Sequence, residues 1–347
     1  MYNYIGDCMK VAIDKTCIDI VKDYNYEFIY LFDDEPLKEL LKLNLHCVKY
    51  DKCDSVDINL TDYDIDCVKK TNINDKDWNI LPKYKDFKIA IIVPNFNYEH
   101  TLKKCLNSIL NQTYQNFEII FVDDVSTDNS VKIAKELLKP PHKIIQLKQK
   151  RLNGGARNEA YLYVSDDVDY IYYVDSDDWL NNETALERIN KKLQTKPDVL
   201  FVGMEEYRKG KQRICYLPDF KDKYEAMEGW SGSCGKVIKK ELATRQDCLY
   251  AEGTLKEDRN QHFRVCIKMN SFKCLKEPVY VWNRENQKSI TTIRENVLWG
   301  TSTIRHLADT KQLYLEEKGK DRKTDMILKK RIECCKTEIR EGGDRQW

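Results

Sequence analysis

Residues 88–97 read KIAIIVPNFN, and this segment gives the clearest indication of the fold class. The run from Ile89 to Val93 is apolar without interruption, and a polar loop follows at once. An uninterrupted apolar run of this length predicts a β-strand buried on both faces, as found in parallel sheets that helices cover on each side. We therefore expect residues 88–93 to form a central strand of an α/β domain.

Strand and helix patterns alternate downstream of this run. The connections between them are short, which favours a mostly parallel central sheet flanked by helices. Strands are expected at residues 117–122, 143–147, 169–174 and 198–203, and helices at residues 98–111, 128–138, 154–164 and 182–194. In such sheets, ligands bind beyond the carboxyl ends of the strands.

Residues 1–86 differ from the rest of the chain in charge. They contain 12 Lys, no Arg and 18 Asp plus Glu, whereas the whole chain has 58 basic and 57 acidic residues. This shift predicts a domain boundary near residue 86. Residues 26–32 and 46–50 are expected to be strands and residues 36–44 a helix, so we expect an acidic α/β accessory unit whose role the sequence does not show.

Residues 294–347 predict a helical C-terminal extension. Residues 324–340 place Met326, Ile327, Ile332 and Cys335 among Lys and Arg, a pattern typical of an amphipathic helix. Packing on the rest of the chain or on another subunit is the favoured interpretation, and contact with a membrane surface is the alternative. The chain ends at GGDRQW without a recognisable cap, which leaves a longer natural protein open.

The overall composition excludes few classes of protein. The formal net charge of +1 argues neither for nor against a polyanionic partner. The N-terminus lacks the pattern of a signal peptide, and no apolar run approaches the roughly 18 residues of a membrane helix. The 13 Cys show no CxxC pair, which fits reduced thiols and disfavours structural zinc. We expect a cytoplasmic protein, with peripheral membrane contact left open.

Polar clusters follow the expected strands at residues 94–97, 123–130 and 175–178. In the second cluster, Asp124 lies at a strand end and can accept hydrogen bonds from a ribose or a base. Ser126, Thr127 and Asp128 instead fit the capping of a helix start. Phe96, in the first cluster, offers a ring on which a nucleobase could stack, although a loop phenylalanine is more often simply packed.

The segment RLNGGARNEA, residues 151–160, combines paired glycines with Arg151, Arg157 and Asn158 at an expected helix start. Free backbone N–H groups at a helix start, together with a guanidinium, suit a diphosphate. A glycine-rich turn with a solvated arginine explains this segment alone equally well.

The segment YIYYVDSDDWL, residues 170–180, brings three carboxylates to the end of an apolar strand. Asp175 and Asp177 point the same way on an extended backbone, because side chains alternate with a period of two. Oxygen ligands in an open site suit Mg²⁺ or Mn²⁺, completed by substrate phosphates. We expect Asp178 at the start of the following helix. The alternative for the whole cluster is a solvated acidic turn before that helix.

These motifs, in this order, resemble the family 2 glycosyltransferases, inverting enzymes of the GT-A fold that use nucleotide sugars. The likeness extends from IIVPNFN through NGGARNEA and YVDSDDWL to GWSGSCGKVIKKEL at 229–242, LKEDRNQHFRV at 255–265 and EPVYVWNRENQKSIT at 277–291. It covers about residues 87–293, which we therefore expect to form the catalytic domain. Two departures are Phe96, where many relatives have Tyr, and Val125, where many have Gly.

The resemblance implies a role for each matching residue. Asp177 corresponds to the metal-holding carboxylate, supported by Asp175, and Asp258 to the general base, with Glu257 beside it. Phe96 corresponds to the base-stacking aromatic, Asp124 to the acid that holds the uracil or ribose, and Arg157 to the segment facing the diphosphate. The complete implied set is Pro94, Phe96, Asn97, Asp124, Asn153, Arg157, Asp175 and Ser176 for the nucleotide sugar, and Trp230, Lys236 and Arg284 for the acceptor side.

The resemblance therefore implies transfer of a sugar from a nucleotide diphosphate donor, UDP-sugar above all, to a hydroxyl of a glycan or glycolipid, with Mn²⁺ or Mg²⁺ as cofactor. Two alternatives stay open: a nucleic-acid base or a protein as acceptor, and a scaffold that binds nucleotide sugars without catalysis. Nucleotidyl transfer is disfavoured, because PNFNYEHT after the first strand is not a glycine-rich, basic loop.

Overall fold

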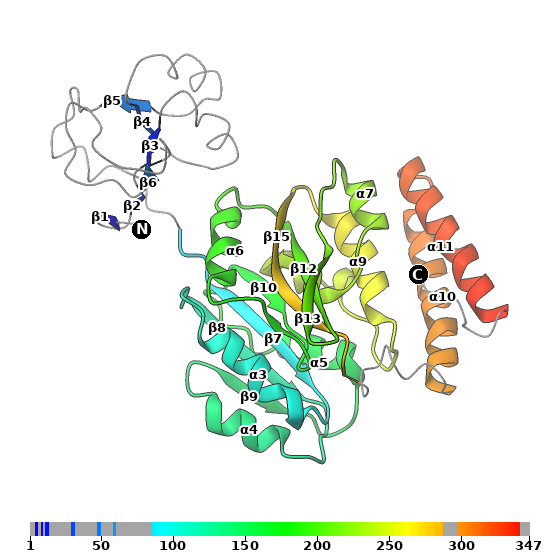
Figure 1. Cartoon of the computed structure of the whole chain (residues 1–347). Coiled ribbons are helices and arrows are strands. Elements are labelled where there is room, and N and C mark those ends of the chain that lie inside the picture. The colour runs from blue at the N-terminus through cyan, green and yellow to red at the C-terminus, as the bar shows by residue number, and fades with distance from the viewer. Residues whose placement is uncertain are drawn as a thin grey trace. The chain divides into compact units, whose positions relative to one another are not determined.

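The computed structural model describes residues 85–286 and 297–340, together with the backbone of six short strands within residues 1–84. The chain divides into two compact units, Met1–Lys85 and Asp86–Trp347 (Figure 1). Each unit is described here by itself.

The first unit contains a four-stranded sheet in the order β5-β4-β3-β6, and all its neighbouring pairs are parallel. Its strands β4 and β5 lie within the two ranges predicted as strands, whereas the helix predicted at residues 36–44 lies outside the described residues. The strands of this unit are β1 (Tyr4–Ile5), β2 (Cys8–Met9), β3 (Val11–Ile13), β4 (Ile29–Leu31), β5 (Cys47–Lys49) and β6 (Ile58–Asn59).

The first half of the second unit confirms the predicted alternation. Its four strands run parallel in the order β10-β7-β8-β9. The elements are β7 (Ile89–Asn95), α3 (Glu99–Leu110), β8 (Phe117–Asp123), α4 (Ser130–Leu137), β9 (Lys143–Gln146), α5 (Leu152–Tyr161) and β10 (Tyr170–Tyr173).

The second half makes the sheet more mixed than the alternation predicts. The full order is β11-β15-β12-β14-β10-β7-β8-β9, with β13 paired to β12. Strand β14 lies between β10 and β12 and is antiparallel to both, whereas β15 is parallel to β12. The strands concerned are β11 (Trp179–Leu180), β12 (Val199–Arg208), β13 (Lys211–Tyr216), β14 (Lys236–Lys239) and β15 (Phe272–Asn283).

Helices cover both faces of this sheet. The strand residues alternate between them: Ile89 and Ile91 enter one core with α3 and α6, and Ala90 and Ile92 enter the other with α5 and α9. The remaining helices are α6 (Ala185–Leu193), α7 (Lys223–Glu228), α8 (Lys240–Ala243), α9 (Glu257–Lys268), α10 (Val297–Glu317) and α11 (Arg322–Arg340).

The predicted C-terminal helices are confirmed as α10 and α11, which form the orange and red pair in Figure 1. Leu313 and Leu328 are fully buried in the core that α5 and α9 share, while Met326 is exposed. Packing on the rest of the chain was therefore the correct interpretation of this segment. Among the described residues, no helix has the length and apolar character needed to cross a membrane.

The pairing register brings the predicted polar clusters to one edge of the sheet. Asn95 at the end of β7 pairs with Asp123 at the end of β8, and Tyr173 at the end of β10 pairs with Ile92. Asn97 and Val125, in the loops after β7 and β8, have positive φ angles, and so does Leu152 at the start of α5. The edge is thus built from tight turns, one of which contains a β-branched residue.

Val125 is the residue least suited to its turn. Its φ angle is 66°, a left-handed conformation that costs an L-residue about 1–2 kcal/mol, and its side chain is 39% exposed. We predict that Val125→Gly raises the free energy of unfolding by about 1 kcal/mol, since glycine avoids this cost but loses some chain entropy.

Urea denaturation followed by tryptophan fluorescence measures this change, because every tryptophan except Trp78 belongs to the second unit. Val125→Ala is the matched control and should gain less, since alanine keeps a Cβ atom. A Val125→Gly variant that unfolds at lower urea than the parent would contradict the assignment of strain to this turn.

Candidate active site

A cleft of about 160 Å³ opens at the carboxyl-end edge of the sheet in the second unit. Segments that are far apart in the sequence form its walls, including the loop after β7, the start of α5, the loop after β10 and the start of α9. Of the residues predicted for the site, the cleft is lined by Pro94, Asn153, Arg157, Asp175, Ser176, Asp177, Trp230, Glu257 and Asp258.

Arg157 is the buried centre of this arrangement. Its side chain is 3% exposed, and its guanidinium donates to Asp175 Oδ1 and to Glu257 Oε1, each at 2.7 Å. Burial alone would lower the pKa of Arg157, but the two carboxylates raise it well above its usual value. Its Nε atom is buried and has no hydrogen-bond partner among the residues that the structure describes. The resemblance placed Arg157 towards a diphosphate, whereas the structure places it between two protein carboxylates.

Glu257 and Asp258 open helix α9 and differ in environment. Glu257 is buried, and burial raises its pKa to about 7, although Arg157 acts to lower it. Asp258 is half-buried and lines the cleft, and its carboxylate accepts no hydrogen bond from the residues that the structure describes. The first turn of a helix stabilises a negative charge, so Asp258 is a carboxylate available to a ligand.

Asp177 lies at the wall of the cleft and is 8% exposed. Asn286 donates to its Oδ2 at 2.8 Å, and Asn283 donates to its backbone oxygen at 3.1 Å. Burial, and after it the negative charge of Asp175, raises the pKa of Asp177 to about 6. Both causes favour the protonated form of Asp177, and a cation bound beside the two carboxylates would act against them.

Asp178 has a different role from the one that we expected. It does not start a helix, because α6 begins at Ala185. Its Oδ2 accepts a 2.5 Å hydrogen bond from the Tyr280 hydroxyl, and its Oδ1 accepts the backbone N–H of Asn283 at 2.8 Å. Burial, followed by the charges of Asp177 and Asp175, raises its pKa well above the usual value. Asp178 thus anchors the loop to β15.

Phe96 and Asp124, the two residues predicted to contact the nucleobase or ribose, do not line the cleft. The ammonium of Lys150 is 2.9 Å from the centroid of the Phe96 ring. The two carboxylate oxygens of Asp124 accept the backbone N–H groups of Arg151 and Leu152, at 2.6 and 2.8 Å. Asp124 therefore holds the start of α5. Lys150, which lies just before that helix, contacts the Phe96 ring.

The turn residues beside this region have structural partners. Asn97 has a positive φ angle, and its Oδ1 accepts the backbone N–H of Thr127 at 2.7 Å. Asp128 was correctly predicted to cap, since it accepts the N–H of Ser130 at the start of α4 and also that of Glu99 at the start of α3. Ser126 accepts from Asn97 instead of capping α4.

The three residues predicted for the acceptor side lie in three different environments. Trp230 lines the cleft and meets Trp282 edge to face, with ring centroids 5.3 Å apart. Lys236 is fully buried outside the lining and donates to the carbonyl oxygens of Ser231 and Gly232, and burial lowers its pKa to about 8. Arg284 is exposed, 4.1 Å from the Trp282 ring centroid.

Lys236 therefore shapes the loop that carries Trp230, and its side chain does not enter the cleft. Ser176 likewise uses its hydroxyl internally, donating to the carbonyl oxygen of Pro94 at 2.6 Å. This bond ties the loop after β10 to the loop after β7.

The residues of this region that sequence reasoning missed include Tyr98, Tyr280, Trp282 and Asn286. Tyr98 and Trp282 line the cleft, and Tyr280 and Asn286 hold Asp178 and Asp177. The segment EPVYVWNREN contains three of them, and its run of β-branched and aromatic residues after Pro278 was the available signal for a strand.

The donor set fits a divalent cation that a ligand helps to hold. Asp175 and Asp177 are neighbouring carboxylates whose mutual repulsion a cation would relieve. Among the described residues, no group of three or more His, Cys, Asp and Glu side chains could form a closed metal cage. Two carboxylates in an open cleft match the preference of Mg²⁺ and Mn²⁺ for oxygen ligands and substrate phosphates.

Comparison with known proteins gives matches to glycosyltransferases in sequence and in fold. The family model "Glycosyl transferase family 2" matches residues 90–249. Glycosyltransferase GlyA of Streptococcus pneumoniae is 42% identical over 109 residues, which cover 31% of this chain and 15% of GlyA. The uncharacterized glycosyltransferase EpsJ of Bacillus subtilis is 28% identical over 225 residues, covering 59% of this chain and 63% of EpsJ. The chain thus spans less than two thirds of these curated relatives.

Among solved structures, the crystal structure of Staphylococcus aureus TarS 1–349 in complex with UDP-GlcNAc has a similar fold. The TM-score is 0.57 at 22% sequence identity, and the match covers 70% of each chain. Residues 90–249 of this chain therefore match glycosyltransferase family 2, within a domain of GT-A fold.

Proposed function

We propose that this chain transfers a sugar from a UDP-sugar to a hydroxyl of a glycan or glycolipid acceptor, with inversion at the anomeric carbon. The observation that carries the proposal is the cleft itself, in which Asp175, Asp177 and Asp258 face one space while Arg157 holds two of their supporting segments together. The catalytic domain in this proposal is residues 87–293, and residues 294–347 are a helical extension.

The choice of donor and acceptor is supported by the relatives. WfgD of Escherichia coli is named as a UDP-Glc:α-D-GlcNAc-diphosphoundecaprenol β-1,3-glucosyltransferase, and it is 35% identical over 103 residues. A Bacillus spizizenii relative, 34% identical over 117 residues, is named as a poly(ribitol-phosphate) β-glucosyltransferase. UDP-sugars and carbohydrate or lipid-linked acceptors are therefore the substrates to test first.

In the proposed reaction, Asp258 is the general base. It takes the proton of an acceptor hydroxyl while that oxygen forms a bond to the anomeric carbon. The bond between this carbon and the β-phosphate oxygen breaks at the same time, and its electron pair leaves with UDP. Attack from the side opposite the diphosphate inverts the carbon. Asp258 suits this role because it lines the cleft and has no hydrogen-bond donor among the described residues.

Asp177, with Asp175, would hold Mn²⁺ or Mg²⁺ together with the donor diphosphate. When bound there, the ion supplies positive charge that stabilises the leaving diphosphate. Arg157 keeps Asp175 in place and fixes the start of α9 through Glu257. Its main role in this proposal is therefore to position these two carboxylates, Asp175 and Glu257. Phe96 and Asp124 border the region that the proposal assigns to the nucleobase of the donor.

A direct assay tests the function. The chain is incubated with UDP-glucose or UDP-N-acetylglucosamine and Mn²⁺, and released UDP is measured. Slow UDP release without an added acceptor, with water as the acceptor, is the expected result. No release from any UDP-sugar would favour a non-catalytic nucleotide-sugar-binding protein.

Removing the proposed base should separate catalysis from binding. We predict that Asp258→Asn lowers the rate of UDP release by about 10²–10⁴-fold, the usual contribution of a general base, while UDP affinity stays near that of the parent. Asp219→Asn, an exposed position, is the control. Turnover of Asp258→Asn within a few-fold of the parent would show that the base is another residue.

Removing the proposed metal ligand should act on binding. We predict that Mn²⁺ strengthens UDP binding to the parent chain and that Asp177→Ala abolishes this increase. Calorimetry with and without Mn²⁺ measures both. Asp167→Ala, an exposed carboxylate paired with Lys88, should keep the Mn²⁺ effect. If Asp177→Ala responds to Mn²⁺ as the parent does, the ion binds elsewhere.

The role of Arg157 can be tested through stability. Arg157→Met leaves Asp175 and Glu257 without their shared cation, and breaking a buried ion pair in this way costs about 3–5 kcal/mol. Arg245→Met removes an exposed pair with Asp247 and should cost below about 1 kcal/mol. Urea denaturation compares the two, and equal losses would contradict a central role for Arg157.

A further inference from the structure

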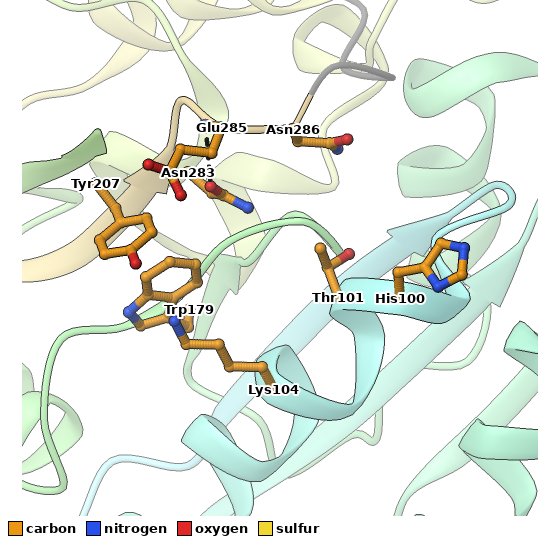
Figure 2. Close-up of a pocket in the computed structure, with 8 residues that line it drawn as sticks. All are labelled: His100, Thr101, Lys104, Trp179, Tyr207, Asn283, Glu285 and Asn286. Atoms are coloured by element: carbon orange, nitrogen blue, oxygen red, sulfur yellow. Dashed lines mark hydrogen bonds between the residues drawn. The ribbon is translucent and has the colours of Figure 1, made fainter. Parts of the chain in front are cut away.

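A second pocket, of about 380 Å³, lies next to the cleft in the same unit. Figure 2 shows its lining, which comes from the start of α3, from β11 and β12, and from the segment that ends β15. Its volume falls within the roughly 300–1,000 Å³ of pockets that bind small molecules. None of the roles assigned above uses this pocket.

Residues 176–178 line the cleft, and three residues that line the pocket donate hydrogen bonds to Ser176 and Asp177. On the pocket side, Thr101 donates to the backbone oxygen of Ser176 at 3.0 Å. Asn286 donates to the Asp177 carboxylate, and the Asn283 side chain donates to the Asp177 carbonyl oxygen. A ligand in the pocket would therefore touch the side chains that orient the proposed metal ligand.

One side of the pocket is aromatic. Trp179 and Tyr207 meet edge to face with ring centroids 5.3 Å apart, and Figure 2 shows them beside the Lys104 ammonium. That ammonium is 3.0 Å from the Trp179 ring centroid and 5.1 Å from the Tyr207 ring centroid. Within the described residues, Lys104 has no hydrogen bond or ion pair, so its three N–H donors are available to a ligand oxygen.

The other side of the pocket is polar, and its charge is balanced. Glu285 lies close enough to Lys104 to act on its pKa, which burial lowers and Glu285 raises. One Glu285 oxygen accepts the N–H of Gly210 at 3.0 Å. A strongly anionic ligand would gain from Lys104 but would be repelled by Glu285. The pocket therefore suits a neutral ligand that has an apolar face and hydroxyl groups at its edge.

We propose that this pocket is a saccharide-binding subsite that holds a sugar unit of the acceptor other than the one that reacts. A sugar ring combines C–H faces, which pack on aromatic side chains, with hydroxyls that pair with Lys104 and Glu285. The donor would occupy the cleft on the other side of Asp177, so the sugar in this pocket belongs to the acceptor. This assignment to the acceptor rests on the proposed function.

Ligand-observed NMR on the full chain tests the subsite. Saturation-transfer difference spectra are recorded for methyl β-glucoside, methyl β-galactoside and methyl β-N-acetylglucosaminide, with saturating UDP and Mn²⁺ to block the cleft. We expect saturation transfer to the ring protons of at least one glycoside. Tyr207→Ala should weaken its binding about tenfold, because the aromatic surface is lost.

Two further variants keep the test sharp. Lys104→Ala changes an exposed helix position that does not support the core, and it should also weaken the glycoside. Tyr163→Ala makes the same change as Tyr207→Ala at an exposed tyrosine outside the pocket and should leave glycoside binding unchanged. Circular dichroism identifies any variant that fails to fold.

The possible outcomes separate the subsite from the proposed function. No glycoside binding while UDP is bound, or binding that both Tyr207→Ala and Lys104→Ala leave intact, would overturn the subsite. Displacement of the glycoside by inorganic phosphate would assign the pocket to an anion and would also overturn it. Glycoside binding in a chain that releases no UDP from any UDP-sugar would keep the pocket as a sugar site and reject its role with an acceptor.

Discussion

The arrangement of the cleft depends on one buried guanidinium. Arg157 on α5 bonds to Asp175, 18 residues away, and to Glu257, 100 residues away. Burying either carboxylate alone would be costly, and the shared cation makes both tolerable. The same two bonds fix the end of β10 against the start of α9. Asp258 therefore lies in the cleft because its neighbour Glu257 is held by Arg157.

A second set of bonds holds the loop after β10 from the opposite side. Tyr280 and Asn283 on β15 bind Asp178, and Asn286 binds Asp177. Asp175, Asp177 and Asp178 thus obtain three different environments: an ion pair for Asp175, an amide contact for Asp177 and a buried phenol for Asp178. Asp177 is the proposed metal ligand, and Asn286, which binds it, also lines the second pocket.

The strands and helices from β7 to β12, apart from the short strand β11, could be predicted, because burial of a central strand produces a local apolar run that needs no knowledge of its neighbours. The position of the polar clusters at one edge also followed from parallel topology. Strand β14 was not predicted, since Lys236 and Lys239 give it no strong pattern, although it lies at the centre of the sheet. The predicted role of Asp178 at a helix start was wrong for a similar reason. Its partners come from β15, more than 100 residues later.

Local sequence patterns were enough to predict the α/β alternation, the family resemblance and the acidic residues near the cleft. Contacts between distant segments set the rest: Arg157 faces Asp175 and Glu257, Asp124 holds the start of α5, and Lys236 is buried behind the loop that it supports. The physical reason is that a charged side chain takes its role from its burial and its partners. Periodicity records which face of an element is buried, but the partners of these residues are set by contacts between distant segments, which no local pattern records.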